Sequence, residues 1–265
     1  MKKLRRLFIL LILVGSTYAG WNYRDLLVEF YYQKIANDIS PKEAPKPDPK
    51  PDPKRYQKLI SELAEKRLNL TEKYSRARTA REISDVVSES QQTLEQILPA
   101  MMSCWLGTPW DFNGICQTPG SGKIACGYFV STILRDAGFS VERVRLAQQP
   151  SQWIIGTFLS KKMMTIRAGQ NYDTFVDQAI ERGPGIHIVG LDNHVAFVVI
   201  PESGGIRFIH SSGAHPFCVV DEDRSEAVSL QRSNYRVIGN LTQSPEVIHG
   251  WLVGQKWPTK ISSGK

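Results

Sequence analysis

Cys126 stands where a glycine-rich turn, residues 119–122, runs into an amphipathic helix that ends before Gly138. A helix N-terminus presents free N–H groups and partial positive charge, which favour a thiolate over a thiol. A free cysteine is only slightly ionised at neutral pH, so a nucleophilic cysteine needs such an environment. This position predicts an activated thiol nucleophile.

Two histidines flank a hairpin predicted downstream of that cysteine. Residues 194–200 and 206–210 are apolar and β-branched, and Pro201 begins a turn that runs through two glycines. His194 opens the first strand and His210 closes the second, so both lie at the open end of the hairpin. The order of cysteine, histidine and a second polar ring is that of a nucleophile, a base and an orienting group.

The register of this hairpin has two alternatives. If Ile200 faces Ile206, then His210 faces Ala196 and His194 is its diagonal neighbour on the same face. A turn shifted by one residue on each side places the histidines directly opposite each other. Diagonal side chains ~7 Å apart still allow two long rings to touch. Both registers predict His194 as the general base and His210 as the group that orients it.

The periodicity around these residues predicts an α+β fold, with an antiparallel sheet packed on the helix that follows Cys126. We expect helices at residues 56–80, 82–103, 126–137 and 172–182, and strands at residues 186–190, 194–200, 206–210 and 235–239.

The N-terminus has the pattern of an export signal, which we assign to residues 1–20. Four cations precede the apolar run of residues 7–15, and small residues follow it. Cleavage of this signal and its retention as an anchor over residues 7–21 are both open. Either outcome predicts an exported protein, in the periplasm or outside the cell, and retention of the segment predicts that the protein contacts the membrane through it.

Further boundaries follow from composition. We expect a short helix at 21–40, a spacer at 41–54, a helical segment at 55–83 and the main domain at 84–265. The spacer repeats Lys-Pro-Asp-Pro, which favours an extended polyproline II rod. The two helices after it are compatible with a stalk and with packing on the main domain.

Charge and cysteine content set further limits. Of the net charge of +7, residues 1–60 carry +6, from 12 Lys and Arg against 6 Asp and Glu, and the remainder has 21 against 20. A nucleic-acid-binding core should itself be basic, so we expect no nucleic-acid partner. The sequence leaves a Cys104–Cys116 disulfide open, and Cys218 is expected to be a buried strand residue. No closely spaced ligand pair suggests zinc, and we expect neither a metal nor a cofactor.

Four segments of the chain resemble the NlpC/P60 family of cell-wall cysteine peptidases, in the order and spacing of that family. They are Gly107–Trp110, Ala125–Val130, Asn193–Val198 and Phe208–Ser212, and the resemblance covers roughly residues 84–245. It implies a papain-like α+β fold and a triad of Cys126, His194 and His210. It also implies hydrolysis of amide bonds in peptidoglycan stem peptides, the activity typical of the family.

The chain departs from the family pattern beside the nucleophile. Ala125 and Gly127 replace the usual Asp and Ser, and Trp110 stands at the place of a tyrosine that helps to hold the oxyanion. Two alternatives therefore stay open. One is a cysteine amidase or deamidase acting on a protein substrate, and the other is a membrane-anchored, non-catalytic binding or scaffolding module of the same fold.

Overall fold

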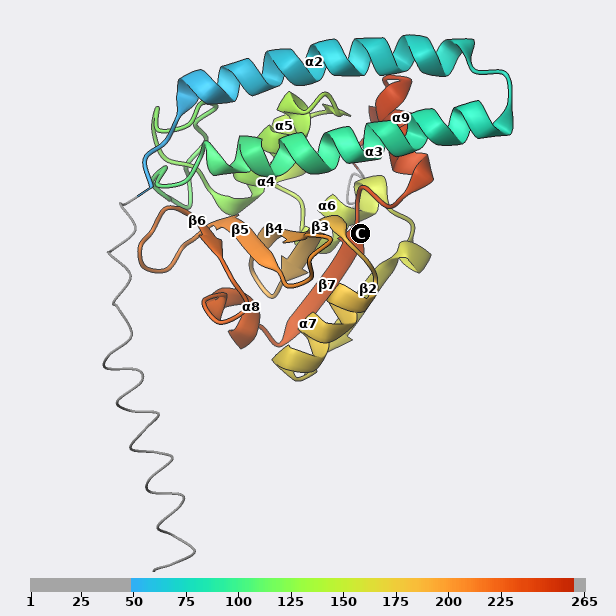
Figure 1. Ribbon diagram of the computed structural model, residues 1–265. Coiled ribbons are helices and arrows are strands. Elements are labelled where there is room, and N and C mark those ends of the chain that lie inside the picture. Colours follow the sequence, from blue (N-terminus) through green and yellow to red (C-terminus); the bar gives the residue numbers. More distant parts are fainter. Residues whose placement is uncertain (1–48, 260–265) are drawn as a thin grey trace, which may run out of the picture. The chain divides into compact units, whose positions relative to one another are not determined.

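Six antiparallel strands form the central sheet of this protein in a computed structural model, which describes residues 49–259 (Figure 1). Their order in the sheet is β2-β7-β3-β4-β5-β6. The strands are β2 (Met164–Ala168), β3 (Gly185–Leu191), β4 (Val195–Ile200), β5 (Arg207–Ser211), β6 (Val219–Glu222) and β7 (Tyr235–Asn240). The α+β class and the antiparallel sheet predicted from the sequence are confirmed.

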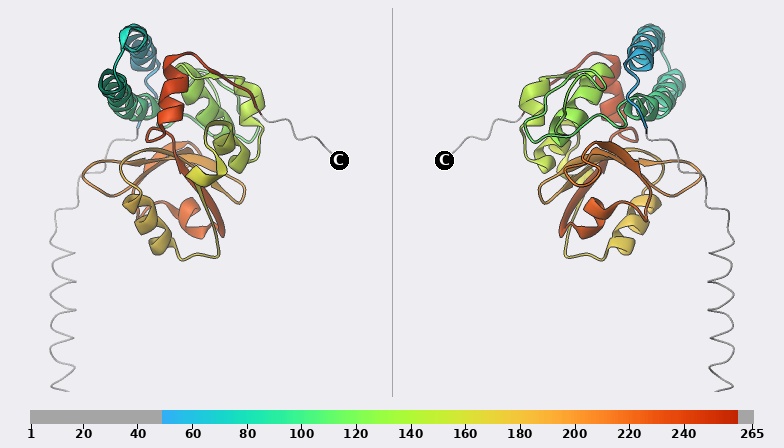
Figure 2. Two further views of the ribbon diagram at one scale, coloured as in Figure 1. Left: turned by 90° about the vertical axis from the view of Figure 1, so that its right-hand side faces the viewer. Right: turned by 90° about the vertical axis from the view of Figure 1, so that its left-hand side faces the viewer.

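Both faces of the sheet are covered, as the two side views show (Figure 2). Alternate residues of β4 belong to different hydrophobic clusters: Phe197 faces the larger one and Val198 the smaller one. This explains why β4 is apolar throughout rather than alternating with polar residues. The larger cluster includes α4 (Cys126–Asp136) and α6 (Ser151–Phe158), and the smaller one includes α7 (Tyr172–Glu181) and α8 (Val228–Arg232).

A long helical hairpin precedes the sheet. Helix α2 (Pro53–Arg76) begins with Asp52, whose side chain accepts a hydrogen bond from the Arg55 backbone at 2.9 Å. Helix α3 (Ala80–Ser103) begins with a capping box between Thr79 and Glu82. The Ala77 N–H, which donates to the Lys73 and Tyr74 carbonyls, ends α2, and with the capping box it limits the connection between the two helices to three residues.

The hairpin packs onto the rest of the described chain. Leu63 and Leu70, one heptad apart on α2, are buried in the same cluster as the apolar residues of α4. Arg67 of α2 donates to the Trp251 carbonyl at 2.8 Å. Packing, not a free stalk, is therefore the observed arrangement. The boundary expected between residues 83 and 84 falls inside α3, and the last two residues of the expected spacer, 53 and 54, belong to α2.

The remaining elements complete the layer on the side of α4. They are β1 (Ser140–Val141), α5 (Arg143–Ala147), the short 3₁₀ helix η1 (Lys161–Met163), α9 (Pro245–Leu252) and β8 (Lys256–Trp257), with β1 and β8 paired in parallel. No helix within residues 49–259 is long and apolar enough to span a membrane. The expected signal at residues 1–20, the short helix at 21–40 and most of the spacer lie outside the described residues.

Candidate active site

Cys126 is the first residue of α4, as the sequence predicts. The turn before it is fixed from two directions. The Ile124 backbone N–H donates to the Pro109 carbonyl at 2.9 Å. The buried Ser211 hydroxyl, at the end of β5, donates to the Ile124 carbonyl at 2.7 Å. The strand that carries His210 is thereby tied to the turn that carries the cysteine.

His194 ends the turn between β3 and β4. Its carbonyl accepts from the Leu191 N–H at 2.8 Å, which closes the turn. The Asp192 carboxylate accepts hydrogen bonds from the backbone N–H groups of Asn234 at 2.8 Å and of Tyr235 at 3.1 Å. These bonds hold the turn against the start of β7, so the position of His194 is set by two neighbouring strands.

The structure brings His194 and His210 together. The register Phe197↔Ile209 is the first of the two alternatives, in which the histidines are diagonal neighbours. The Nε2 atom of His194 lies 2.8 Å from Nδ1 of His210. One ring therefore holds the other in a fixed orientation through a direct hydrogen bond.

A fourth residue, Glu222 of β6, extends this pair, and the sequence analysis did not find it. Its Oε2 lies 3.2 Å from Nε2 of His210, which is completely buried. The only sequence signal was a carboxylate at the end of a short apolar run. Adjacent Asp221 carries the same signal but forms an ion pair with Arg207. The register of β6 decides which of the two carboxylates reaches the histidine.

Burial dominates the electrostatics of the site. Burial lowers the pKa of His210 to about 3. Burial, together with a smaller effect of the neighbouring His210, lowers the pKa of His194 to about 3. Burial also raises the pKa of the Cys126 thiol, although the backbone N–H groups of Val195, Gly127 and Cys126 act in the opposite direction. The donors at the helix N-terminus favour the thiolate, as the sequence predicts, but desolvation outweighs them and the net change in the thiol pKa is upward.

Cys126 and His194 both line a cleft of about 1070 Å³. Within residues 49–259 the structure has no hydrogen bond between the Cys126 thiol and the His194 ring. Because Nε2 of His194 is bonded to His210, its Nδ1 is the nitrogen that remains for proton exchange. Hydrogen bonds of catalytic pairs often form only once a substrate is present.

Searches of protein-family models, curated proteins and solved structures found no match to this chain.

The local packing explains one departure from the NlpC/P60 pattern. A Cβ atom on Gly127 would lie 2.2 Å from the Ala147 carbonyl oxygen, a distance that permits no side chain. The last residue of α5 occupies the space that a serine would need. Trp110 does line the cleft, and its ring lies against Phe217 at 6.5 Å between centroids. Its indole N–H donates to none of the residues that the structure describes.

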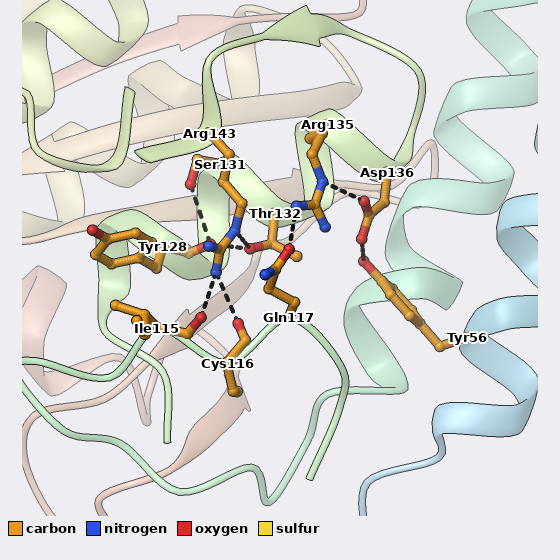
Figure 3. A network of polar contacts seen from close by, with 10 residues as sticks. All are labelled: Tyr56, Ile115, Cys116, Gln117, Tyr128, Ser131, Thr132, Arg135, Asp136 and Arg143. Carbon is orange, nitrogen blue, oxygen red and sulfur yellow. Dashed lines mark hydrogen bonds and ion pairs between the residues drawn. The ribbon is translucent and has the colours of Figure 1, made fainter. Parts of the chain in front are cut away.

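A polar network around Arg143 connects α4 to the segment of residues 115–117 (Figure 3). The buried Arg143 guanidinium donates to the Thr132 hydroxyl at 2.7 Å and to the Ile115 and Cys116 carbonyls at 3.0 and 2.8 Å. It also lies over the Tyr128 ring, 4.9 Å from the centroid. These oxygen atoms satisfy the cation without a carboxylate. Arg143 thereby joins the loop at Ile115 and Cys116 to α4.

At the other end of α4, Asp136 joins the network to the helical hairpin. Its carboxylate accepts from the Tyr56 hydroxyl at 2.9 Å and from the Arg135 guanidinium at 2.7 Å (Figure 3). Helix α2 thus contacts α4 at Asp136, the end of the helix that is opposite to Cys126.

The remaining cysteines stay apart. None of the four cysteines forms a disulfide, so the Cys104–Cys116 bond that the sequence left open is not formed in this structure. Cys218 is half-buried and pairs with Pro109 in an isolated bridge just before β6, rather than inside a strand. In the described part of the chain, no three His, Cys, Asp or Glu side chains are grouped so that they could hold a metal ion.

Proposed function

We propose that this protein is an exported cysteine amidohydrolase that cleaves amide bonds in peptidoglycan stem peptides. Cys126 is the nucleophile, His194 the general base and His210 the residue that orients it. The observation that carries the proposal is the 2.8 Å contact between the two histidine rings, of which His194 lines the same cleft as Cys126, the first residue of α4.

A papain-like NlpC/P60 fold is part of this proposal. It is supported by the packing of α4 against β4 and β5 of an antiparallel sheet, and by the four sequence segments that resemble the family. Two of those segments, Ala125–Val130 and Phe208–Ser212, contain Cys126 and His210, and the Ser211 hydroxyl of the second donates to the carbonyl of Ile124, directly before the first.

The proposed reaction begins with a neutral thiol and a neutral imidazole. As Sγ of Cys126 attacks the carbonyl carbon, its proton passes to Nδ1 of His194, an S–C bond forms and an electron pair moves onto the oxygen. Collapse of this intermediate breaks the C–N bond, and the amine leaves with the proton from His194. Water then attacks the thioester carbon, gives one proton to His194 and displaces the sulfur, which regains that proton.

The start of α4 also suggests how the oxyanion is stabilised. The first turn of a helix leaves N–H groups without intrahelical partners. The N–H groups of Cys126 and Gly127 both act on the thiol. They therefore lie near the carbon that the sulfur would attack, and they take the role that the resemblance assigns to a tyrosine.

Mass spectrometry of soluble peptidoglycan fragments tests this function. The full chain and its Cys126→Ala variant are incubated with the fragments at equal concentration. New stem-peptide products from the wild type alone support the proposal and identify the bond that is cut. Equal product formation by both proteins, or none by either, contradicts it.

An apolar part of the cleft lining favours a second candidate, an amidase for a substrate with an apolar acyl group. Phe112 is 79% exposed and Ile115 58% exposed, and both line the cleft with Trp110 and Tyr128. Such exposed apolar groups usually mark a binding surface. Paired peptide amides with phenylalanine or serine at the acyl position separate the candidates: a strong preference for phenylalanine, without cleavage of peptidoglycan fragments, supports the second one.

A further inference from the structure

The Glu222 carboxylate lies at the end of a hydrogen-bonded chain that starts at the proposed base. Nε2 of His194 contacts Nδ1 of His210 at 2.8 Å, and Nε2 of His210 contacts Oε2 of Glu222 at 3.2 Å. His210 is completely buried, so both of its ring nitrogens have protein partners and neither depends on bulk water.

The direction of each hydrogen bond follows from the chemistry of the carboxylate. An ionised Glu222 only accepts, so Nε2 of His210 must carry the proton. A neutral imidazole has one N–H, which leaves Nδ1 of His210 as an acceptor for the N–H on Nε2 of His194. Nδ1 of His194 is then unprotonated, which is the form that can take the thiol proton of Cys126.

We infer that Glu222 is a positioning residue that fixes, through His210, the tautomer in which His194 can accept a proton from Cys126. This inference rests on the proposed function of the same site. The carboxylate has a second effect, since its negative charge stabilises the imidazolium that forms on His194 during attack.

The surroundings of Glu222 contain few charges that compete with His210. Within residues 49–259, the His210 ring is the only group that hydrogen-bonds or ion-pairs with the Glu222 carboxylate. The other charged side chains on the elements around it are Arg207 on β5, Asp221 on β6, Asp223, Arg224 and Glu226 in the following turn, Asp173, Asp177 and Glu181 on α7, and Arg232 on α8. Arg207 is paired with Asp221, and Arg224 with Asp173 and Asp177, so these two cations are already engaged. Arg232 forms no ion pair within residues 49–259 and lines the cleft.

The ionisation of Glu222 makes this arrangement sensitive to pH. Burial and the nearby Asp221 raise the pKa of Glu222 to about 7. A protonated carboxyl can donate to Nε2 of His210, which permits the opposite order of protons along the chain and places a proton on Nδ1 of His194. The base is then blocked, so the reaction should slow as the pH falls through the Glu222 pKa.

Histidine tautomers can be measured without any substrate. The full chain is labelled with ¹⁵N-histidine, and the ring nitrogens of His194 and His210 are followed by NMR from pH 8.5 to pH 5.5. We expect Nε2–H forms at high pH and a rising share of Nδ1–H forms as the pH falls. In Glu222→Gln this change near pH 7 should disappear, whereas Glu202→Gln, the same substitution in an exposed turn, should behave as the wild type. Tautomers that do not respond to pH, or that respond equally in Glu222→Gln, overturn the inference.

Kinetics then separate the inference from the proposed function. In Glu222→Gln we expect kcat/KM for the cleaved amide to fall on the order of tenfold or more, with loss of the acid limb of the pH profile. If Glu222→Gln hydrolyses the amide with an unchanged rate and an unchanged pH profile, the role of Glu222 is overturned and the proposed amidohydrolase function still stands. A tautomer change that depends on Glu222, with no amide cleaved by any variant, supports the relay and contradicts the proposed function.

Discussion

His194 and His210 are 16 residues apart in the chain, and their rings meet through a hydrogen bond of 2.8 Å between Nε2 and Nδ1. The contact crosses the open end of the β4–β5 hairpin. It uses the same nitrogen of His194 that would otherwise compete for the thiol proton, so it leaves Nδ1 for exchange with Cys126. An imidazole that is neutral and oriented before substrate binds is suited to general-base catalysis.

The thiol of Cys126 should ionise late when no substrate is present. Burial raises its pKa, so we expect the rate of alkylation by iodoacetamide at Cys126 to keep increasing above pH 9. Peptide mapping by mass spectrometry distinguishes Cys126 from the other three cysteines, none of which is in a disulfide. A rate that reaches its plateau below pH 7 would show a resting thiolate and would contradict this electrostatic account.

Gly127 should tolerate no side chain. Because a Cβ atom would meet the Ala147 carbonyl at 2.2 Å, Gly127→Ala has to displace α5 or the start of α4. We expect a loss of about 1–3 kcal/mol in the free energy of unfolding, measured by urea titration, together with loss of activity. Gly122→Ala is the control, since its Cβ would lie 3.4 Å from the Cys116 side chain. Equal stability of the two variants would contradict the close approach.

Two leucines of α2 test whether the helical hairpin belongs to the folded core. Leu63 is 1% exposed and Leu68 is 61% exposed, so the same truncation to alanine should have very different effects. We expect Leu63→Ala to lower the free energy of unfolding by about 2–5 kcal/mol and Leu68→Ala by less than about 0.5 kcal/mol. Both values come from urea unfolding of the full chain. A small effect at both positions would indicate a hairpin that contributes little to the core.

Buried histidines should make the fold sensitive to acid. Burial lowers the pKa of His187 to about 4 and of His194 and His210 to about 3, below the value of about 6.5 in an unfolded chain. The unfolded chain therefore binds more protons, and the stability present above pH ~6.5 is lost as the pH falls toward the folded pKa values. Glu222 acts in the opposite direction, because its folded pKa of about 7 is raised and its contribution is lost as the pH rises through that value.

The balance of these groups can be measured. Three imidazoles take up protons on unfolding and one carboxyl releases one, for a net uptake of about two protons near pH 5.5. Urea unfolding between pH 7.5 and pH 5 should show a free energy of unfolding that decreases as the pH falls. In His187→Gln, the slope of this free energy against pH should correspond to about one proton fewer. A stability that is independent of pH across this range would contradict the buried, neutral histidines.

Local patterns in the sequence explain how much of the site could be predicted. Alternation of apolar residues and a glycine-containing turn determine the pairing of β4 with β5, and thus the meeting of His194 and His210. The position of Cys126 follows from its glycine-rich turn and the helical periodicity after it. Each of these features depends on residues close together in the chain.

Long-range packing determines what the sequence could not predict. Glu222 reaches His210 only through the register of β6, which follows the irregular connection of residues 212–218. The raised pKa of the Cys126 thiol depends on burial beneath segments far from it in sequence. Similarly, the capped ends of α2 and α3 could be read locally, but their packing on α9 could not.

Intact-protein mass spectrometry of an acid-quenched reaction tests the central claim most directly, namely that Cys126 attacks an amide carbonyl. The full chain is mixed with peptidoglycan fragments, quenched within seconds and mapped by proteolysis, beside Cys126→Ala. We expect a mass increase in the wild type that equals an acyl fragment and is located on Cys126, with none in the variant. Product formation by the wild type without any adduct on Cys126, and at the same rate in Cys126→Ala, would contradict the account.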